Sequence, residues 1–119
     1  MIAEPHAFAA DWLAAWNAHE VEAVLRHFHD EASFTSPFAA RLLPESGGRL
    51  VGKQAIRDYW TFAIARVPNL HFELVELFLG VDCLVIAYRN QDGIRVNEVL
   101  KFAGDLVIEG HGTYPPEPA

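Results

Sequence analysis

The chain has 119 residues, the size of one domain. Its 16 Asp and Glu residues outnumber 9 Lys and Arg residues, and the formal net charge of −7 leaves no basic surface for nucleic acid or an anionic membrane. The 51% of hydrophobic residues suffices for a core, and the single cysteine, Cys83, excludes an internal disulfide or a cysteine-rich metal site. We expect one cytoplasmic domain over residues 1–119, with no signal peptide and with neither nucleic acid nor membrane as a partner.

The first half of the chain carries the helical pattern. Residues 5–18 are predicted to form a helix that begins at Pro5, because apolar and aromatic side chains recur there every three to four residues. A second, short helix is expected over residues 20–28. A third is expected over residues 53–67, with an apolar stripe on one side and Pro68 at its end.

Between the second and third helices the pattern is less regular. Residues 33–36 predict a short strand that ends at Pro37. Residues 38–49 contain Pro44 and Gly47-Gly48 and are expected to form a long, irregular loop, of the kind that often acts as a lid or a mobile edge.

The second half of the chain carries extended runs. Residues 70–79, 82–90, 94–102 and 106–114 are separated by short turn sequences, which predicts an antiparallel meander. Helices followed by such a sheet indicate an α+β domain, a cone in which three helices pack on the concave face of a curved antiparallel sheet. The proline-containing tail, residues 115–119, is expected to be loose.

Four segments, in order along nearly the whole chain, resemble one known family: Trp12–Ala32, Thr35-Ser36-Pro37, Gly52-Lys53-Gln54-Ala55-Ile56 and Glu98-Val99-Leu100-Lys101-Phe102. The resemblance is to the SnoaL-like group of the nuclear transport factor two-like superfamily, which includes ketosteroid isomerases, polyketide cyclases and scytalone dehydratase. It implies the cystatin-like cone and a homodimer. It does not imply one activity, because the superfamily uses one fold for many functions.

The ketosteroid isomerase pattern is only partly present. Where that pattern has a proton-transferring Asp before the proline that ends the first strand, this chain has Ser36. Where it has a Tyr in the first helix as an oxyanion donor, this chain has Trp12. Glu98 matches the second acid of the pattern, on the penultimate strand. Because the proton-transferring base is lost, the resemblance does not predict ketosteroid isomerisation by that route.

Glu98 also stands out from the alternation of its own strand. Residues 94, 96, 100 and 102 are Ile, Val, Leu and Phe, and Glu98 lies in the middle of this apolar face. A carboxylate there loses hydration, which raises its pKa and makes it the candidate catalytic residue. Two structural interpretations remain open: a hydrogen bond from a buried Trp or Tyr, or an ion pair with an Arg at the rim.

Several other side chains are candidates to line a cavity. The ligand-binding residues are predicted to be Trp12, Trp16, Phe34, Ser36, Trp60, Tyr88 and Asn90. His71 and His111 could approach the cavity or face solvent. Arg41 and Arg49 could meet an anionic group at its mouth, although ordinary surface positions are the simpler interpretation. No metal-ligand spacing and no cofactor motif is found, so neither is expected.

These features support two functional hypotheses. The first is a pocket for a small apolar molecule in which Glu98 transfers a proton, as in a cofactor-independent isomerase, cyclase or dehydratase. The second is a non-catalytic binding or dimerisation module whose cone is filled by its own side chains, an adaptor for a partner protein being a variant of it. Val99 and Val107 are predicted to lie on the outer face of the sheet, which favours a homodimer.

Overall fold

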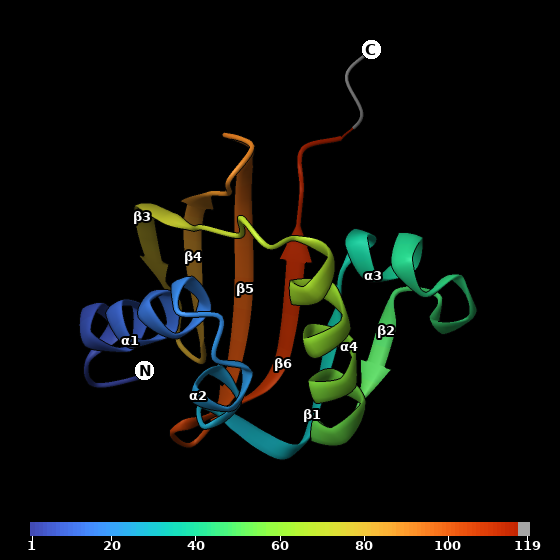
Figure 1. Cartoon of the computed structure of the whole chain (residues 1–119). Coiled ribbons are helices and arrows are strands. Elements are labelled where there is room, and N and C mark those ends of the chain that lie inside the picture. Colours follow the sequence, from blue (N-terminus) through green and yellow to red (C-terminus); the bar gives the residue numbers. More distant parts are fainter. Residues whose placement is uncertain (117–119) are drawn as a thin grey trace.

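Three helices cover the concave face of a curved six-stranded sheet in the computed structural model, which describes residues 1–116 (Figure 1). They are α1 (Pro5–Asn17), α2 (Val21–Leu25) and α4 (Lys53–Arg66). The α+β cone is therefore confirmed, and the ranges predicted for the first and third helices agree with α1 and α4 within one residue. None of the helices described has the length and apolar character that a membrane crossing requires.

Aromatic side chains attach these helices to the sheet. Trp12 and Trp16 lie one turn apart on α1, and Trp60 on α4 meets Trp16 edge to face, with ring centroids 4.9 Å apart. Trp60 also packs against Phe28 and Phe34 of the sheet, at centroid distances of 5.2 and 5.4 Å. Burial of large rings between helix and strand is the dominant source of stability in such a layer.

The sheet has the strand order β2-β1-β6-β5-β4-β3. The predicted meander is present as β3 (Glu73–Leu79), β4 (Cys83–Arg89), β5 (Arg95–Ala103) and β6 (Leu106–Thr113), all antiparallel neighbours. One contact differs from the wholly antiparallel sheet that was expected, because β1 (Phe28–Thr35) pairs with β6 in parallel. Parallel neighbours need a long crossover connection, and here everything between β1 and β6 serves as that connection.

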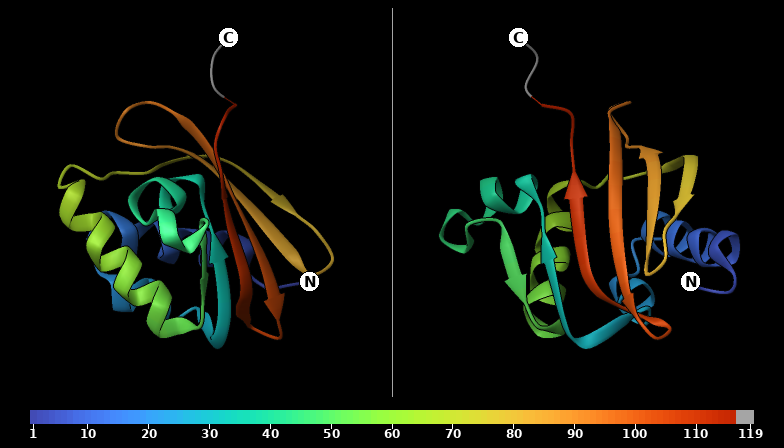
Figure 2. Two further views of the ribbon diagram at one scale, coloured as in Figure 1. Left: turned by 90° about the vertical axis from the view of Figure 1, so that its right-hand side faces the viewer. Right: turned by 180° about the vertical axis from the view of Figure 1, so that it is seen from behind.

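Irregular pairing bends the sheet, as the side view shows (Figure 2). The register shifts between Leu74 and Glu76 in β3 and between Lys101 and Phe102 in β5. Such bulges increase the local twist and change which face a side chain occupies. The second shift turns Val107 inward, where it is fully buried, so its predicted place on the outer face is wrong.

The second helix is shorter, and the first strand longer, than predicted. Helix α2 ends at Leu25, and β1 begins at Phe28 rather than at residue 33. Phe28 is buried on the core side, as the helical interpretation required, but it is held there by pairing with Val107. An apolar residue at the end of a short helix fits a helical pattern and a strand pattern equally well, so pairing with the neighbouring strand decides which element forms.

Residues 38–49 are not one irregular loop. They hold α3 (Pro37–Leu42), a 3₁₀ turn (Pro44–Ser46) and the start of β2 (Arg49–Val51), which pairs antiparallel with β1. The Ser36 hydroxyl accepts a hydrogen bond from the Phe38 N–H at 3.1 Å and caps α3. Ser followed by Pro is a helix-start signal as well as a strand end, and here both apply.

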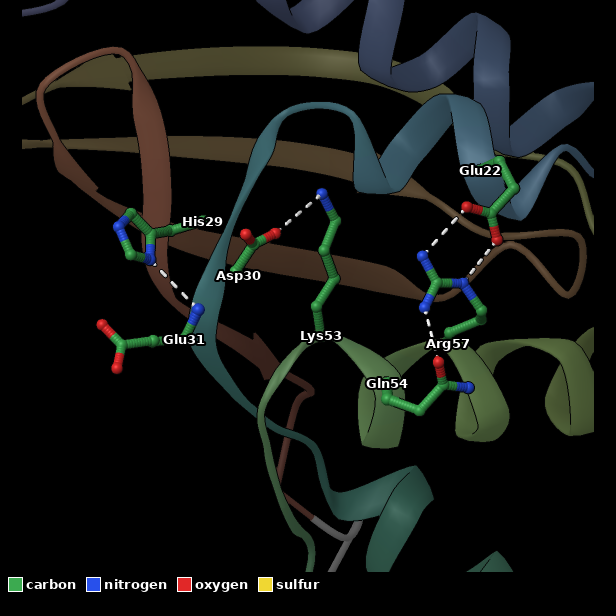
Figure 3. Close-up of polar contacts among 7 residues, drawn as sticks. All are labelled: Glu22, His29, Asp30, Glu31, Lys53, Gln54 and Arg57. Atoms are coloured by element: carbon green, nitrogen blue, oxygen red, sulfur yellow. Dashed lines mark hydrogen bonds and ion pairs between the residues drawn. The ribbon is translucent and has the colours of Figure 1, made fainter.

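Polar contacts on the surface join α2 to α4 (Figure 3). The Arg57 guanidinium donates to both carboxylate oxygens of Glu22, at 2.6 and 3.0 Å, and to the side chain of Gln54 at 2.9 Å. Lys53, at the start of α4, lies 3.8 Å from Asp30 of β1. The Arg57 contacts therefore join α2 to α4, and the Lys53 pair joins α4 to β1, at the end of the molecule opposite α3.

Candidate functional site

The interior contains a cavity of about 990 Å³ that opens at one end of the molecule. The carboxyl end of α4, helix α3, the β4–β5 turn and the segment after β6 lie together at this end (Figure 1). The walls are mainly aromatic and aliphatic: Trp16, Phe34, Phe38, Trp60, Ala63, Ile64, Val67, Leu70, Phe72 and Ile94. The polar groups that line it are Ser36, Arg41, Tyr59, Arg66, Asn69, Tyr88, Asn90, Gln91, Asp92, Glu98 and Tyr114.

Glu98 lies in this cavity on the inward face of β5, between Val96 and Leu100. It is 7% exposed and is the only charged side chain buried among residues 1–116. Burial raises the pKa of Glu98 to about 7, and the hydrogen bond from the Tyr88 hydroxyl to Oε1, at 3.1 Å, acts in the opposite direction. The carboxyl therefore exchanges a proton readily near neutral pH, which is the property a general acid or base requires.

Three phenols surround this acid. Burial raises the pKa of Tyr88 well above its usual range, and the Glu98 charge adds to the effect. Burial also raises the pKa of Tyr59, and that of Tyr114 to about 12. All three hydroxyls therefore stay protonated. The Tyr88 proton is already donated to Glu98, so Tyr59 and Tyr114 are the phenols able to donate to an oxygen in the cavity.

Ser36 lies at the same end of the cavity, at the junction of β1 and α3. A methyl group placed on Gly112 of β6 would lie 3.4 Å from both Ser36 Oγ and Glu98 Oε1. Glycine at this position therefore keeps open the space between the hydroxyl and the carboxyl. No histidine of residues 1–116 lines the cavity, and Ser36 Oγ accepts the hydrogen bond that caps α3, so a nucleophilic serine is not indicated.

The structure brings six of the seven residues predicted to bind ligand to the cavity wall: Trp16, Phe34, Ser36, Trp60, Tyr88 and Asn90. Trp12 does not line the cavity. It lies behind the wall, stacked on Phe72 and tilted against Tyr88 at centroid distances of 6.0 and 5.8 Å. The side-chain oxygen of Asn90 is already used, because it accepts from the backbone of Asp92 and Ile94 in the β4–β5 turn.

Sequence reasoning missed Tyr59, Tyr114 and Phe72. Tyr59 precedes Trp60 on α4, and both are buried, so the helix presents a wider face to the interior than its apolar stripe indicated. Phe72 and Tyr114 fall inside the predicted strands 70–79 and 106–114 but just outside β3 and β6, and the alternation of those runs did not single them out. Pro115 and Pro116, expected in a loose tail, line the cavity mouth; residues 117–119 of that tail lie outside the described residues.

The remaining candidates lie elsewhere. His71 is exposed, and His111 lies on the outer sheet face, where Nδ1 is 2.6 Å from Thr35 Oγ1 and Nε2 is 3.3 Å from Glu109. Arg41 and Arg49 are both exposed, and of the two Arg41 lines the cavity. Within residues 1–116, no three His, Cys, Asp or Glu side chains come together as metal ligands.

Comparisons with known proteins agree with this architecture. A family model described as a SnoaL-like domain matches residues 9–110. A SnoaL-like protein of unknown function from Burkholderia thailandensis is 36% identical, with a TM-score of 0.85 over 93% of this chain and 97% of that one. A search of curated proteins gives no match.

Two more distant structures share the fold. A putative polyketide cyclase from Sinorhizobium meliloti is 12% identical, with a TM-score of 0.74 over 90% of this chain and 94% of that one. A putative hydroxylase from Streptomyces galilaeus is 15% identical, with a TM-score of 0.74 over 99% and 93%. At these identities the likeness concerns the fold alone.

Proposed function

The chain belongs to the SnoaL-like family of the nuclear transport factor two-like superfamily, and from that premise we propose that its cavity binds a small, largely apolar molecule on which Glu98 transfers a proton. The observation that carries this proposal is the position of Glu98, a buried acid on the wall of an apolar cavity. The putative cyclase and hydroxylase indicate that the fold is used in small-molecule chemistry, but they do not assign a reaction to this chain.

The chemistry that suits one such acid is proton transfer beside a carbonyl group. The Glu98 carboxylate accepts a proton from a carbon next to the carbonyl, and the C–H electron pair forms an enolate. The resulting carboxylic acid returns the proton to another carbon, to an aldol oxygen or to a departing hydroxyl. These three outcomes are an isomerisation, a cyclisation and a dehydration, and each leaves Glu98 as it began.

The cavity volume supports a ligand. The aromatic side chains of the cone leave about 990 Å³ beside Glu98, at the upper end of the range for small-molecule sites. A cone filled by its own side chains would leave no such space. The second candidate is therefore a binding protein without catalysis, and the hydrogen bond from Tyr88 favours it, because this contact gives Glu98 a structural partner.

Deuterium exchange separates catalysis from binding. The protein is incubated in D₂O at neutral pH with 2-tetralone and 1-indanone, and exchange at the carbon beside the carbonyl is followed by proton NMR. We expect accelerated exchange that falls by about 100-fold or more in Glu98→Gln, since general base catalysis is worth that much. Glu76→Gln, an exposed acid on β3, is the matched control. Equal exchange in wild type and Glu98→Gln would contradict the catalytic proposal and leave the binding protein.

We further propose that the chain forms a homodimer through the outer face of the sheet, where Phe78, Val85 and Val99 form one cross-strand row. Phe78 is 52% exposed, and a ring so exposed on a sheet face is typical of an interface. Sedimentation at micromolar concentration is expected to give twice the 13.3 kDa chain mass, and Phe78→Glu to shift it toward the monomer. A wild-type monomer would contradict this proposal.

A further inference from the structure

Arg41 is the feature of the cavity that proton transfer by Glu98 leaves unexplained. It lies in the last turn of α3, lines the cavity, and has its guanidinium carbon 5.5 Å from the centre of the Phe38 ring. No carboxylate in residues 1–116 forms an ion pair with it. A cation at the mouth of an apolar cavity in a protein of net charge −7 is a specific attraction for a negative group.

Hydroxyl groups on the adjoining wall add donors to this charge. The Ser36 oxygen accepts from the Phe38 N–H, which leaves its O–H group as a donor to a neighbouring phenol or to a ligand. Tyr59 and Tyr114 lie close to Ser36 and to Arg41: burial raises their pKa values, while a hydrogen bond with Ser36 and the Arg41 charge oppose that rise. Three hydroxyl groups and one guanidinium therefore belong to the lining of the cavity.

The other cation on the wall, Arg66, is already engaged. Its guanidinium carbon lies 3.4 Å from the centre of the Phe62 ring, and Nη1 donates to the Phe62 carbonyl at 3.5 Å. Phe62 is not part of the cavity lining. Of the two arginines on the cavity wall, Arg41 is therefore the one available to bind a ligand.

We propose that the ligand of this cavity is an acid, an aromatic or polycyclic body bearing a carboxylate, and that Arg41 binds this carboxylate with the hydroxyls of Ser36, Tyr59 and Tyr114. The aromatic walls hold the body, and the anionic group is held on the α3 side, across the gap kept open by Gly112 from Glu98. Arginine suits a carboxylate because its planar fork donates two parallel hydrogen bonds. This inference rests on the proposed function only in using the same cavity, and it adds the class of ligand.

The test compares 2-naphthoate with 2-naphthamide, which have the same shape and differ in charge. Calorimetric titration of the wild type at pH 7.5 is expected to give tighter binding of the naphthoate by about tenfold or more. The ratio of the two affinities should fall to near one in Arg41→Gln. It should persist in Arg66→Gln and in Arg49→Gln, an exposed arginine away from the cavity.

Three results would overturn the proposal: equal affinities in the wild type, an unchanged ratio in Arg41→Gln, or a ratio lost in Arg66→Gln. Failure of both probes to bind at millimolar concentration would overturn it as well, because the cavity would then reject the aromatic body. Glu98→Gln keeps the cation and removes a nearby negative charge, so it should bind naphthoate at least as tightly as the wild type does. If Glu98→Gln loses deuterium exchange but keeps the preference for naphthoate over naphthamide, the result therefore concerns the role of Glu98 and not the carboxylate site.

Discussion

The two ends of the interior are built on the same strands and serve different purposes. Toward α2, the inward side chains of β5 are Leu100 and Phe102, and they pack against other apolar groups without a cavity of comparable size. Toward α3, the inward side chains are Val96 and Glu98, both buried, and Glu98 lines the cavity. The alternation of one strand therefore supplies core at one end and a reactive group at the other.

The two ends of the interior divide the tasks of folding and chemistry between them. The closed end satisfies close packing, and the inward side chains of β5 there are all apolar. The open end keeps a carboxyl group in a dry site, which costs free energy when the group is ionised. That cost is tolerable because the closed end supplies the folding energy, and it is what brings the pKa of Glu98 to about 7.

Truncation at the closed end should give the largest effect. Leu100 is fully buried, and Leu100→Ala is expected to lower the free energy of unfolding by about 4 kcal/mol, since it leaves a void that neighbours cannot fill. Ile64 lies on the cavity wall, so Ile64→Ala removes fewer packed contacts and should cost about 1 kcal/mol. Urea denaturation measures both. Equal losses would mean that the two ends are packed alike.

Removing the ionisable group at the open end should stabilise the protein at high pH. The folded pKa of Glu98, about 7, lies above the unfolded value near 4.5, so the folded state holds a proton that the unfolded state releases between these values. Stability from this group is full below the unfolded pKa and is lost as pH rises toward the folded one. Glu98→Gln should match the wild type near pH 4.5 and be more stable by about 3 kcal/mol at pH 8.

Thermal and urea unfolding at pH 5 and pH 8 check this expectation, with Glu76→Gln as the exposed control that should show no such trend. A Glu98→Gln variant that is less stable than the wild type at pH 8 would mean that the carboxylate is ionised and compensated in the fold. That result would remove the physical basis for proton transfer near neutral pH.

The fold could be predicted from local patterns because the sequence of most elements fits either a helix or a strand, and not both. Residues 53–67 have a helical stripe that ends at Pro68, and the four last strands alternate between clear turns. Two of the predictions that failed concern residues that satisfy two patterns. Phe28 suits the end of a helix or the start of a strand, and Ser36-Pro37 ends one element and begins the next.

A site residue could be predicted where a polar side chain interrupts an apolar pattern. It could not be predicted where only the tertiary structure brings the residue to the cavity. Glu98 interrupts an apolar face, so the sequence alone identifies it. Tyr114 and Phe72 lie just outside β6 and β3, and both line the cavity. No local sequence feature distinguishes Arg41 from Arg49. Arg41 lines the cavity because it lies in the last turn of the capped helix α3.

Loss of the α3 cap should give an intermediate effect. Ser36→Ala removes the acceptor for the Phe38 N–H and is expected to cost about 1 kcal/mol, a typical value for a helix cap. Ser33→Ala, on the outer face of β1, is the control. If the two variants are equally stable, α3 is held by its packing against the cavity wall and not by its cap.

The smallest expected effect is at the surface, where a second carboxylate behaves oppositely to Glu98. The hydrogen bond with Arg57 lowers the pKa of Glu22, so stability from this group is present above the unfolded pKa and is lost as pH falls. Because the pair is exposed, Glu22→Gln should destabilise only slightly at pH 7 in low salt, and the difference should vanish in about 1 M salt. Urea unfolding of the two proteins at both salt concentrations measures this. The pH slopes of the Glu22→Gln and Glu98→Gln differences should have opposite signs, since one acid is paired in water and the other is buried. Slopes of the same sign would show that ion pairing, and not burial, controls the acid in the cavity.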